Sequence, residues 1–377
     1  MDFDLTVEQK LLQESARDFL ARECPRERVR EFEETGEAYP PELWRKMAGL
    51  GWMGLIIPEE YGGSGGSFLD LTVLFEVMGF HICPGPFFST VVLGALPVLA
   101  AGSEAQKKAI LPAIARGEHL MTMALAEPDS NGDASSIMAG ATPAGDEFRL
   151  GGVKLFVPYG EHADSILWVG RTGHGENAGD GITVFVVKNG VPGIQKTGLK
   201  TLVRDRQCEL LFKDVRVPKD SVLGKSDLGW PVVENTLEKA SVVLCAEMIG
   251  GAQAVLEMSL RYARERVQFN HPIGSFQAIQ HYLADMWMDI HGSRYLLYKA
   301  AWKISEGMEA GMEAAMAKAR IGEAFRRVTL QGHQIFGGIG FTKEHDMHLY
   351  HKRSMTGDLQ LGHGDVHRER VAVRLEL

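Results

Sequence analysis

Apolar residues follow two different periods along this chain of 377 residues. In residues 6–23 and 40–55 they recur every three or four positions, which places them on one face of a helix. Thr6 starts the first of these stretches with a capping box, and proline opens the second. Residues 67–80 and 102–118 have the same helical period. The first third of the chain is therefore predicted to be helical.

The middle of the chain changes to short β-rich runs separated by Gly, Asn and Asp. Their regular spacing favours an antiparallel barrel or sandwich of roughly 100 residues. The runs cover residues 148–158, 163–172, 181–190, 193–199 and 208–218.

Helical periodicity returns after about Gly224, in three long stretches and a last element that starts near Asp346. We therefore predict a mainly α protein with a central β domain. The predicted parts are an N-terminal helical domain at 1–119, a central β-barrel at 120–223 and a C-terminal four-helix bundle at 224–377.

Composition narrows the class of protein. A hydrophobic content of 45% is enough for two or three domains with cores of their own. A net charge of -9 argues against a nucleic-acid-binding surface. The four cysteines are scattered without a C-x-x-C pair, which suits a reducing compartment. The acidic N-terminus is not a signal peptide, and apolar runs stay short of a membrane span. We expect a soluble cytoplasmic protein.

Four short stretches carry a more specific signal. They are "GLIIPEEYGGSG" (54–65), "MALAEPDSNGDAS" (123–135), "RVQFNHPIGSFQAIQHYLADM" (266–286) and "QIFGGIGF" (334–341). The first is glycine-rich without being a dinucleotide fingerprint, since G-x-G-x-x-G is missing. In this order and spacing, the four stretches resemble motifs of the acyl-CoA dehydrogenase family across essentially the whole chain.

The resemblance implies a helical, β-barrel and helical-bundle fold, usually assembled as a tetramer, with FAD as cofactor. It places the isoalloxazine between the β domain and the C-terminal helices. By resemblance, the residues that contact FAD are Met123, Leu125, Ala126, Gly132, Phe156, Val157, Pro158, Arg266, Gln268, Phe269, Gln334, Gly337 and Gly338.

Elementary chemistry agrees with two of these assignments. The guanidinium of Arg266 suits a pyrophosphate, whose oxygens it can pair in a fork. The adjacent Gly337 and Gly338 allow a backbone to approach a ligand closely. The alternatives are a solvated helix charge for Arg266 and a plain helix C-cap for the glycine pair.

The chain departs from the family pattern at several positions. Ala126 stands where the family has a flavin-contacting Thr, a loss of about 1 kcal/mol of hydrogen bonding. The segment that holds the CoA arm in the family reads Glu238-Lys239-Ala240-Ser241 here, without its arginine. We take Glu238, Ser241 and Leu361 as the substrate-side positions.

The catalytic base is the largest departure. Removing an α-proton from a thioester needs a base. The family's usual Glu position is Leu361 here, and the alternative position on the bundle helix is Ala240. Glu247 is the one carboxylate inside the apolar run Ala240–Ala252. It is a candidate base, a cavity-lining carboxylate that positions substrate, or a member of a structural ion pair.

Histidines cluster near the C-terminus. His345, His348 and His351 are spaced by three residues, and His363 and His367 by four. Such spacings can bind a metal from one helix face. Without a cysteine or a ligand from a third element, we expect interface and surface histidines and no metal. By resemblance, His363 and Asp365 contact FAD; a further hypothesis makes His363 an acid–base group acting through a water.

Three functions remain open. The first is FAD-dependent α,β-dehydrogenation of an unusual acyl-CoA (branched, cyclic, dicarboxylic or aromatic-derived), as in fatty acid or aromatic acid degradation, with electrons passed to an electron-transferring flavoprotein. The second is a non-catalytic or site-completing subunit of a heteromeric assembly, favoured by Leu361. The third is a flavin monooxygenase of the same fold. A homotetramer or a heterotetramer fits the first two, and neither a membrane nor a nucleic acid is expected as partner.

Overall fold

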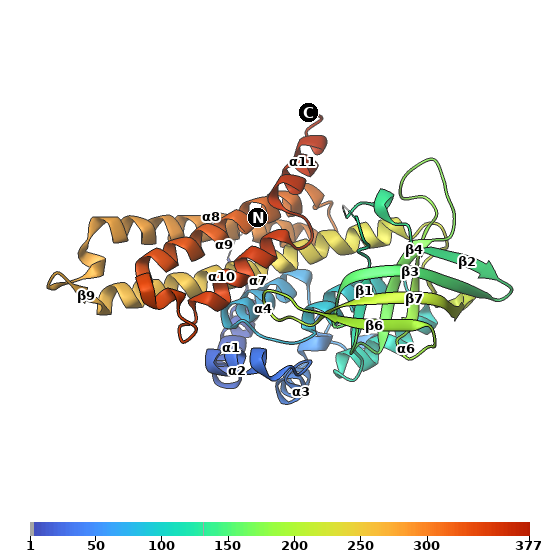
Figure 1. Ribbon diagram of the computed structural model, residues 1–377, viewed down its shortest axis with the longest axis horizontal. Helices are drawn as coiled ribbons and strands as arrows, with labels where there is room; N and C mark the ends of the chain where they lie inside the picture. Colours follow the sequence, from blue (N-terminus) through green and yellow to red (C-terminus); the bar gives the residue numbers. More distant parts are fainter. Residues whose placement is uncertain (1–3, 131) are drawn as a thin grey trace. The chain divides into compact units, whose positions relative to one another are not determined.

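The computed structural model describes residues 4–130 and 132–377, which fold into two compact units (Figure 1). The helical unit contains the chain up to Glu34, Ser67–Cys83 and Glu238–Leu377. The β unit contains Thr35–Gly66 and Pro84–Leu237. Along the chain the order is helices, then strands, then long helices. This order confirms the predicted fold class, a mainly α protein with a central β domain.

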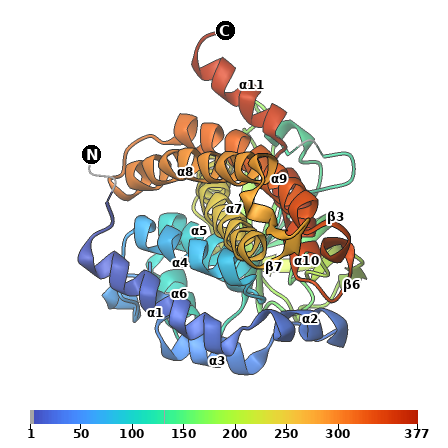
Figure 2. The ribbon, with the colours of Figure 1, turned by 90° about the vertical axis from the view of Figure 1, so that its left-hand side faces the viewer.

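In the helical unit, α9 packs against α8, α10 and α11, while α4 packs against α1 and α8 (Figure 2). The capping box predicted at Thr6 is present, because the Thr6 hydroxyl accepts the main-chain N–H of Gln9. The helices that lie wholly or mostly in this unit are α1 (Val7–Glu23), α2 (Arg26–Thr35), α4 (Phe68–His81), α7 (Trp230–Glu265), α8 (Gln277–Ser305), α9 (Gly311–Phe336), α10 (Met347–Leu359) and α11 (Gly364–Arg374).

The last predicted element is two helices, α10 and α11, separated by residues 360–363. The break is local and steric. Leu361 has φ 58° and Gly362 has φ 101°, and neither value continues a right-handed helix. This break creates the loop that carries the position aligned with the family's usual base.

The β unit holds eight strands in one sheet, in the order β6-β7-β3-β2-β4-β5-β8, with β1 parallel to β4. Its core contains Trp168, Phe185 and Phe212. The ring centroids of Phe185 and Phe212 each lie 5.9 Å from that of Trp168. The strands are β1 (Met121–Ala124), β2 (Gly140–Ala144), β3 (Glu147–Pro158), β4 (Ser165–Arg171), β5 (Ile182–Lys188), β6 (Ile194–Leu199), β7 (Gln207–Pro218) and β8 (Val222–Leu223).

The five predicted β runs correspond to β3, β4, β5, β6 and β7, while β1, β2 and β8 were missed. The missed strands have two to five residues, too few for a period to show. The remaining helices of this unit are α3 (Pro41–Gly49), α5 (Leu96–Ala101), α6 (Glu104–Ala115) and a π-helix over Phe88–Ala95.

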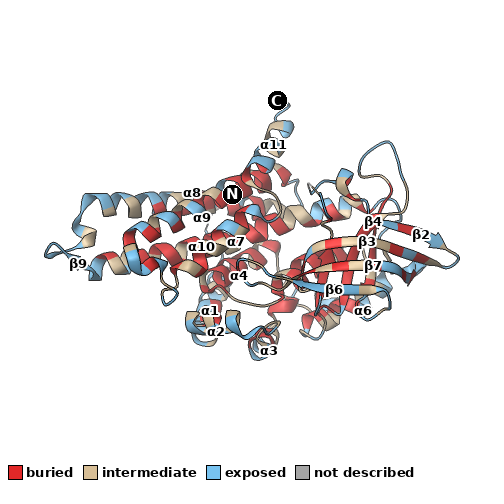
Figure 3. Ribbon diagram, in the orientation of Figure 1, coloured by how far each residue is buried: buried red, intermediate tan, exposed pale blue. Residues whose placement is uncertain are grey.

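Helix α7 is long and apolar enough to cross a membrane by length and composition. However, 83% of its most apolar window is buried inside the protein (Figure 3). That burial is typical of the central helix of a folded core. Within the described residues, α7 alone meets the length and hydropathy of a span.

Candidate active site

Two flavin segments predicted from the sequence lie side by side in the β unit. The first follows β1 and contains Leu125 and Ala126, and the second is the end of β3 at Phe156–Pro158. The main-chain N–H of Leu155 donates to the carbonyl of Ala126 at 2.8 Å. The hydroxyl of Thr122 donates to the carbonyl of Pro158 at 2.6 Å. The structure therefore brings both segments together, with Met123 and Val157 buried beneath them.

Phe156 stands on a β-bulge. Lys154 pairs with Leu210 and Val157 with Cys208, so two residues of β3 oppose the single residue Glu209 of β7. Phe156 has φ 53°, an uncommon value for a residue with a side chain, and its ring is 61% exposed. An exposed aromatic ring on strained backbone is a feature of ligand sites. It offers a flat apolar surface that fits an isoalloxazine.

Gly132 lies in the loop between β1 and β2. It is exposed at φ 85°, and a methyl group added there would meet open space. Its N–H donates to the hydroxyl of Ser130 at 3.1 Å. The ends of this loop are tied by Glu127, whose carboxylate accepts the main-chain N–H groups of Met138 and Ala139. Its neighbour Asn131 lies outside the described residues.

The segments predicted to meet the pyrophosphate and adenosine adjoin at one end of the helical unit. Tyr262, near the end of α7, packs on Phe336 at the end of α9, with ring centroids 4.7 Å apart. Arg266, Gln268 and Phe269 follow α7, and Phe269 is 85% exposed with φ 54°. The exposed Gln334 sits in the last turn of α9, and Gly337 (φ 61°) and Gly338 follow it.

Side-chain hydrogen bonds from Lys318 and His367 hold the loop between α10 and α11. The buried ammonium of Lys318 donates to the carbonyls of Asp358 and Gly362, each at 2.9 Å. Nε2 of His367 donates to the carbonyl of Leu361 at 2.9 Å. Burial lowers the pKa of Lys318, and burial lowers the pKa of His367 to about 4. These contacts hold Leu361, the position aligned with the family's base, in its left-handed conformation.

His363 and Asp365 lie at the start of α11. Nδ1 of His363 accepts the main-chain N–H of Asp365, which makes His363 the N-cap of the helix. Its Nε2 lies 3.3 Å from the buried carboxylate of Asp358, which also accepts a hydrogen bond from Arg326. His363 thus has a structural task that is compatible with the predicted FAD contact.

Glu238 and Ser241 lie on α7. A methyl group at Gly311 would meet a carboxylate oxygen of Glu238 at 2.8 Å and a guanidinium nitrogen of Arg374 at 2.1 Å. The carboxylate and the guanidinium therefore share the space that the missing side chain of Gly311 leaves open. Ser241 is buried. An arginine from α11 thus stands beside the segment that lacks the family's own arginine.

Glu247 is half-buried where α7 crosses α4. Its carboxylate is close enough to affect the thiol of Cys83. A hydrogen bond with Cys24 and burial raise the pKa of Cys83; the Glu247 charge adds to the rise, and Arg353 opposes it. Arg353 pairs with Glu33 at 3.2 Å. Glu247 therefore belongs to a neighbourhood of charged and thiol groups within the helical unit.

The C-terminal histidines stack on aromatic rings. His333 lies on Phe341 with centroids 4.5 Å apart, and His345 packs against Phe336 at 4.3 Å. His351 meets His333 edge-on at 4.9 Å. Within 4–130 and 132–377, three or more His, Cys, Asp or Glu side chains nowhere gather as a metal site would require.

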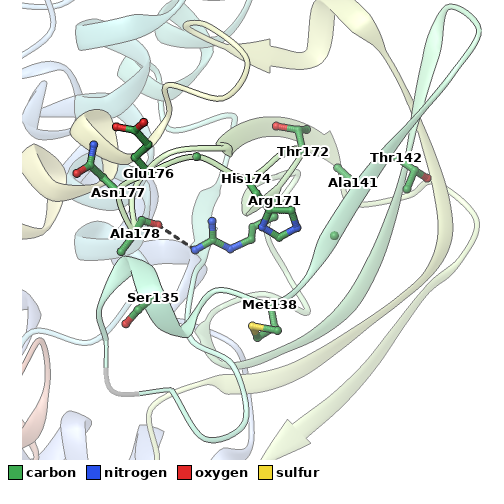
Figure 4. Close-up of a pocket in the computed structure, with 13 residues that line it drawn as sticks. Ser135, Met138, Ala141, Thr142, Arg171, Thr172, His174, Glu176, Asn177 and Ala178 are labelled. Atoms are coloured by element: carbon green, nitrogen blue, oxygen red, sulfur yellow. Dashed lines mark hydrogen bonds between the residues drawn. The ribbon is translucent and has the colours of Figure 1, made fainter.

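A recess of about 700 Å³ opens in the β unit around Arg171 (Figure 4). The guanidinium donates to the carbonyls of Ala134, Ile137, Ala178 and Asp180, at 2.7 to 2.9 Å. These four carbonyls hold the side chain in place without neutralising its charge. The recess is also lined by Ser135, Thr142, Thr172, His174, Glu176 and Asn177.

Sequence reasoning missed Lys154 and Glu127, a buried ion pair beneath the two flavin segments. The available signal was a lysine in the apolar β run "GGVKLFVP" together with the Glu of "AEP". It also missed Arg171 and the recess, because a single arginine at the end of a strand has no sequence signature of its own.

Comparison with known proteins identifies the family. Models of the acyl-CoA dehydrogenase N-terminal, middle and C-terminal domains match residues 6–118, 122–215 and 227–376. The chain belongs to the acyl-CoA dehydrogenase family. This is a family of FAD-dependent oxidoreductases that act on CH–CH bonds of acyl-CoA thioesters. The resemblance read from the four motifs is confirmed, and so is FAD as the cofactor.

Two curated relatives show how far the similarity extends. A probable acyl-CoA dehydrogenase of Bacillus subtilis is 34% identical over 383 residues, which cover 100% of both chains. A caffeyl-CoA reductase-Etf complex subunit of Acetobacterium woodii is 31% identical over 343 residues, 90% of each chain.

Solved structures agree with these relatives. The butyryl-CoA dehydrogenase of Megasphaera elsdenii is 32% identical with a TM-score of 0.94, covering 100% of both chains. An FAD complex of PigA is 25% identical with a TM-score of 0.93, again over 100% of both. A chain of the ChsE4-ChsE5 complex from Mycobacterium tuberculosis is 28% identical with a TM-score of 0.90, over 100% of this chain and 99% of that one.

Proposed function

We propose that this protein catalyses the FAD-dependent α,β-dehydrogenation of an unusual acyl-CoA thioester, with a branched, cyclic, dicarboxylic or aromatic-derived acyl group. Electrons then pass to an electron-transferring flavoprotein. The observation that carries the proposal is the joined pair of segments Leu125–Ala126 and Phe156–Pro158, with Phe156 exposed on its bulge. Residues held in sparsely populated backbone conformations cluster at ligand and active sites.

The proposal gives the named residues different roles in flavin binding and in proton removal. FAD, when bound, supplies the acceptor for the hydride from the β-carbon. Phe156 and the loop after β1 bind and orient its ring, while Arg266 pairs the phosphates of an FAD across a subunit interface. In this proposal Glu247 takes the α-proton. Glu247 is a half-buried carboxylate on an apolar helix, a residue type that can act as a general base.

The nucleotide end of the CoA would enter the recess around Arg171. Four neutral carbonyls hold the guanidinium, so its positive charge remains to attract phosphate. Asn177, Thr172 and Ser135 add hydrogen-bonding groups around it. The polar end of the substrate would thus be recognised by fixed groups of the β unit.

The experiment that tests the proposal is the visible spectrum of the protein purified alone, followed by anaerobic addition of a panel of acyl-CoAs. We expect a yellow protein whose flavin bleaches with one class of thioester. That class then identifies the acyl group. A yellow protein that no thioester reduces would contradict the proposal.

A second candidate function is favoured by Leu361, which leaves the usual base position without a carboxylate. In it, the chain is a subunit that completes the site of a related partner. One structural relative is a chain of a complex between two differently named proteins. A colourless protein that gains FAD only with a co-purified partner would favour this function over the first.

We propose further that the protein is an oligomer of four subunits, joined partly through α8. Trp287, Met288 and Tyr295 on this helix are each more than half exposed, an unusual density of large apolar side chains. Trp287→Asp should lower the mass measured by light scattering. Leu202→Asp, an equally exposed apolar position in the β unit, should leave the mass unchanged.

A further inference from the structure

An ion pair is buried beneath the two flavin segments of the β unit. Nζ of Lys154 lies 2.5 Å from Oε1 of Glu127, and the two side chains are 0% and 5% exposed. Charges this deep interact strongly, because little water screens them. The pair is too far inside the unit to contact solvent, so a surface role is excluded for it.

The pair connects the segments that carry the flavin contacts. Nζ of Lys154 also donates to the carbonyl of Leu125 at 3.1 Å. The next residue, Leu155, donates its N–H to the carbonyl of Ala126. After it comes Phe156 on the β-bulge. The ammonium of Lys154 therefore ties the loop after β1 to strand β3, two residues before Phe156.

The carboxylate of Glu127 has partners besides Lys154. It accepts the N–H groups of Met138 and Ala139, at 2.8 to 3.1 Å. Loss of Lys154 alone would remove the positive charge that lies beside this carboxylate. Loss of Glu127 alone would remove the negative charge that lies beside the buried ammonium of Lys154.

We propose that Lys154 and Glu127 are positioning residues that hold the two flavin segments in register and balance the charge under the flavin, and so set its midpoint potential. The inference rests on the proposed placement of the flavin against Phe156 and the loop after β1. Because a flavin gains electrons on reduction, nearby negative charge disfavours the reduced state and nearby positive charge favours it.

The test is the midpoint potential of bound FAD in three variants of the full-length protein, at about pH 6 to keep Lys154 protonated. Lys154→Met should lower the midpoint potential, because the protein then binds reduced FAD about tenfold less tightly relative to oxidised FAD. Glu127→Gln should raise the potential through a change of about tenfold in the opposite direction. For a two-electron couple, tenfold corresponds to about 30 mV. The double variant should return close to the wild-type potential, since both charges are gone.

Lys219→Met is the matched control. Lys219 pairs with Asp146 at 3.7 Å in the same unit, but on the surface, so its removal should leave the potential unchanged. If Lys154→Met does not fold, Glu127→Gln and the double variant still test the direction in which the midpoint potential shifts. Shifts of one sign in both single variants, or shifts no larger than the control's, would overturn the inference. A wild-type protein that binds no FAD would instead overturn the proposed function.

Discussion

The main chain of Glu247 on α7 lies directly against Gly79 on α4. A methyl group added to Gly79 would lie 2.0 Å from the carbonyl oxygen of Glu247, well inside contact distance. The relationship is repeated one turn along, where a methyl group on Gly250 would lie 1.8 Å from the carbonyl of Glu76. Two glycines therefore let the helices cross with their backbones in contact, and this crossing positions Glu247.

Gly79→Ala should destabilise the helical unit by about 1 to 3 kcal/mol, because the added methyl must separate α4 from α7. Chemical denaturation followed by circular dichroism measures this change. Gly292→Ala is the control, since a methyl there meets open space on α8. It should stabilise the protein by roughly 0.5 to 1 kcal/mol through the better helix propensity of alanine. Equal changes in the free energy of unfolding for the two substitutions would contradict a backbone contact between α4 and α7 at Gly79.

Glu247→Gln should abolish bleaching of the flavin by substrate while FAD stays bound, because an amide cannot take the α-proton. Stopped-flow absorbance under anaerobic conditions measures the loss. Glu257→Gln is the control on the same helix, at a half-exposed site paired with Arg17, and should bleach normally. Full turnover by Glu247→Gln, together with lower thermal stability, would instead make Glu247 a structural carboxylate.

Leu361→Glu, introduced into the Glu247→Gln variant, should restore bleaching at least about tenfold, since each 1.36 kcal/mol of transition-state stabilisation is a factor of ten. Leu361 already holds φ 58°, and a glutamate accepts that backbone at the same cost as leucine. The comparison is with Leu361→Gln in the same background, which has the same shape and no titratable group. Equal rates in the two would show that position 361 does not reach the substrate.

Lys318→Met should loosen the loop between α10 and α11, because the carbonyls of Asp358 and Gly362 lose their buried donor. The local opening free energy should fall by about 1 to 3 kcal/mol. Hydrogen exchange of residues 359–363 reports it. Lys299→Met, which removes a more exposed partner of Glu313, should leave this exchange at the wild-type rate. An unchanged rate in Lys318→Met would mean that His367 alone holds the loop.

Acid should destabilise the helical unit before carboxylates titrate. Burial lowers the pKa of His81 and of His367 to about 4, below the ordinary 6.5. Between these values the unfolded chain binds more protons than the folded one, so the free energy of unfolding falls as pH drops from 6.5 toward 4. The loss is roughly 3 kcal/mol per histidine at the acid end.

Urea denaturation at a series of pH values between 7.5 and 4.5 checks this dependence. His367→Gln should flatten the curve, because its buried imidazole no longer has to charge. His271→Gln, on the exposed hairpin of β9 (Val267–Gln268) and β10 (His271–Pro272), should keep the wild-type curve. A parallel curve for His367→Gln would assign the acid sensitivity to other groups.

Much of the fold could be predicted from the sequence because it is encoded locally. The period of apolar residues identified the helices, and β-rich runs separated by turn residues identified the strands from β3 to β7. The capping box at Thr6 formed as its residues predicted. Motif order was enough to identify the family, because glycines, an arginine and aromatics at fixed spacing report what a ligand needs. The three domain boundaries and the individual site residues stay predictions.

The rest depended on contacts between residues far apart in the chain. No local pattern shows that Lys154 lies under the loop carrying Glu127, that Arg171 gathers four carbonyls, or that Glu247 meets Gly79 at a helix crossing. Periodicity shows that a face is buried, but not which element covers it. The sequence by itself therefore determined the longer elements, the family and the cofactor. Only the tertiary structure decided the surroundings of each charged group, because burial and pairing are properties of the packed chain.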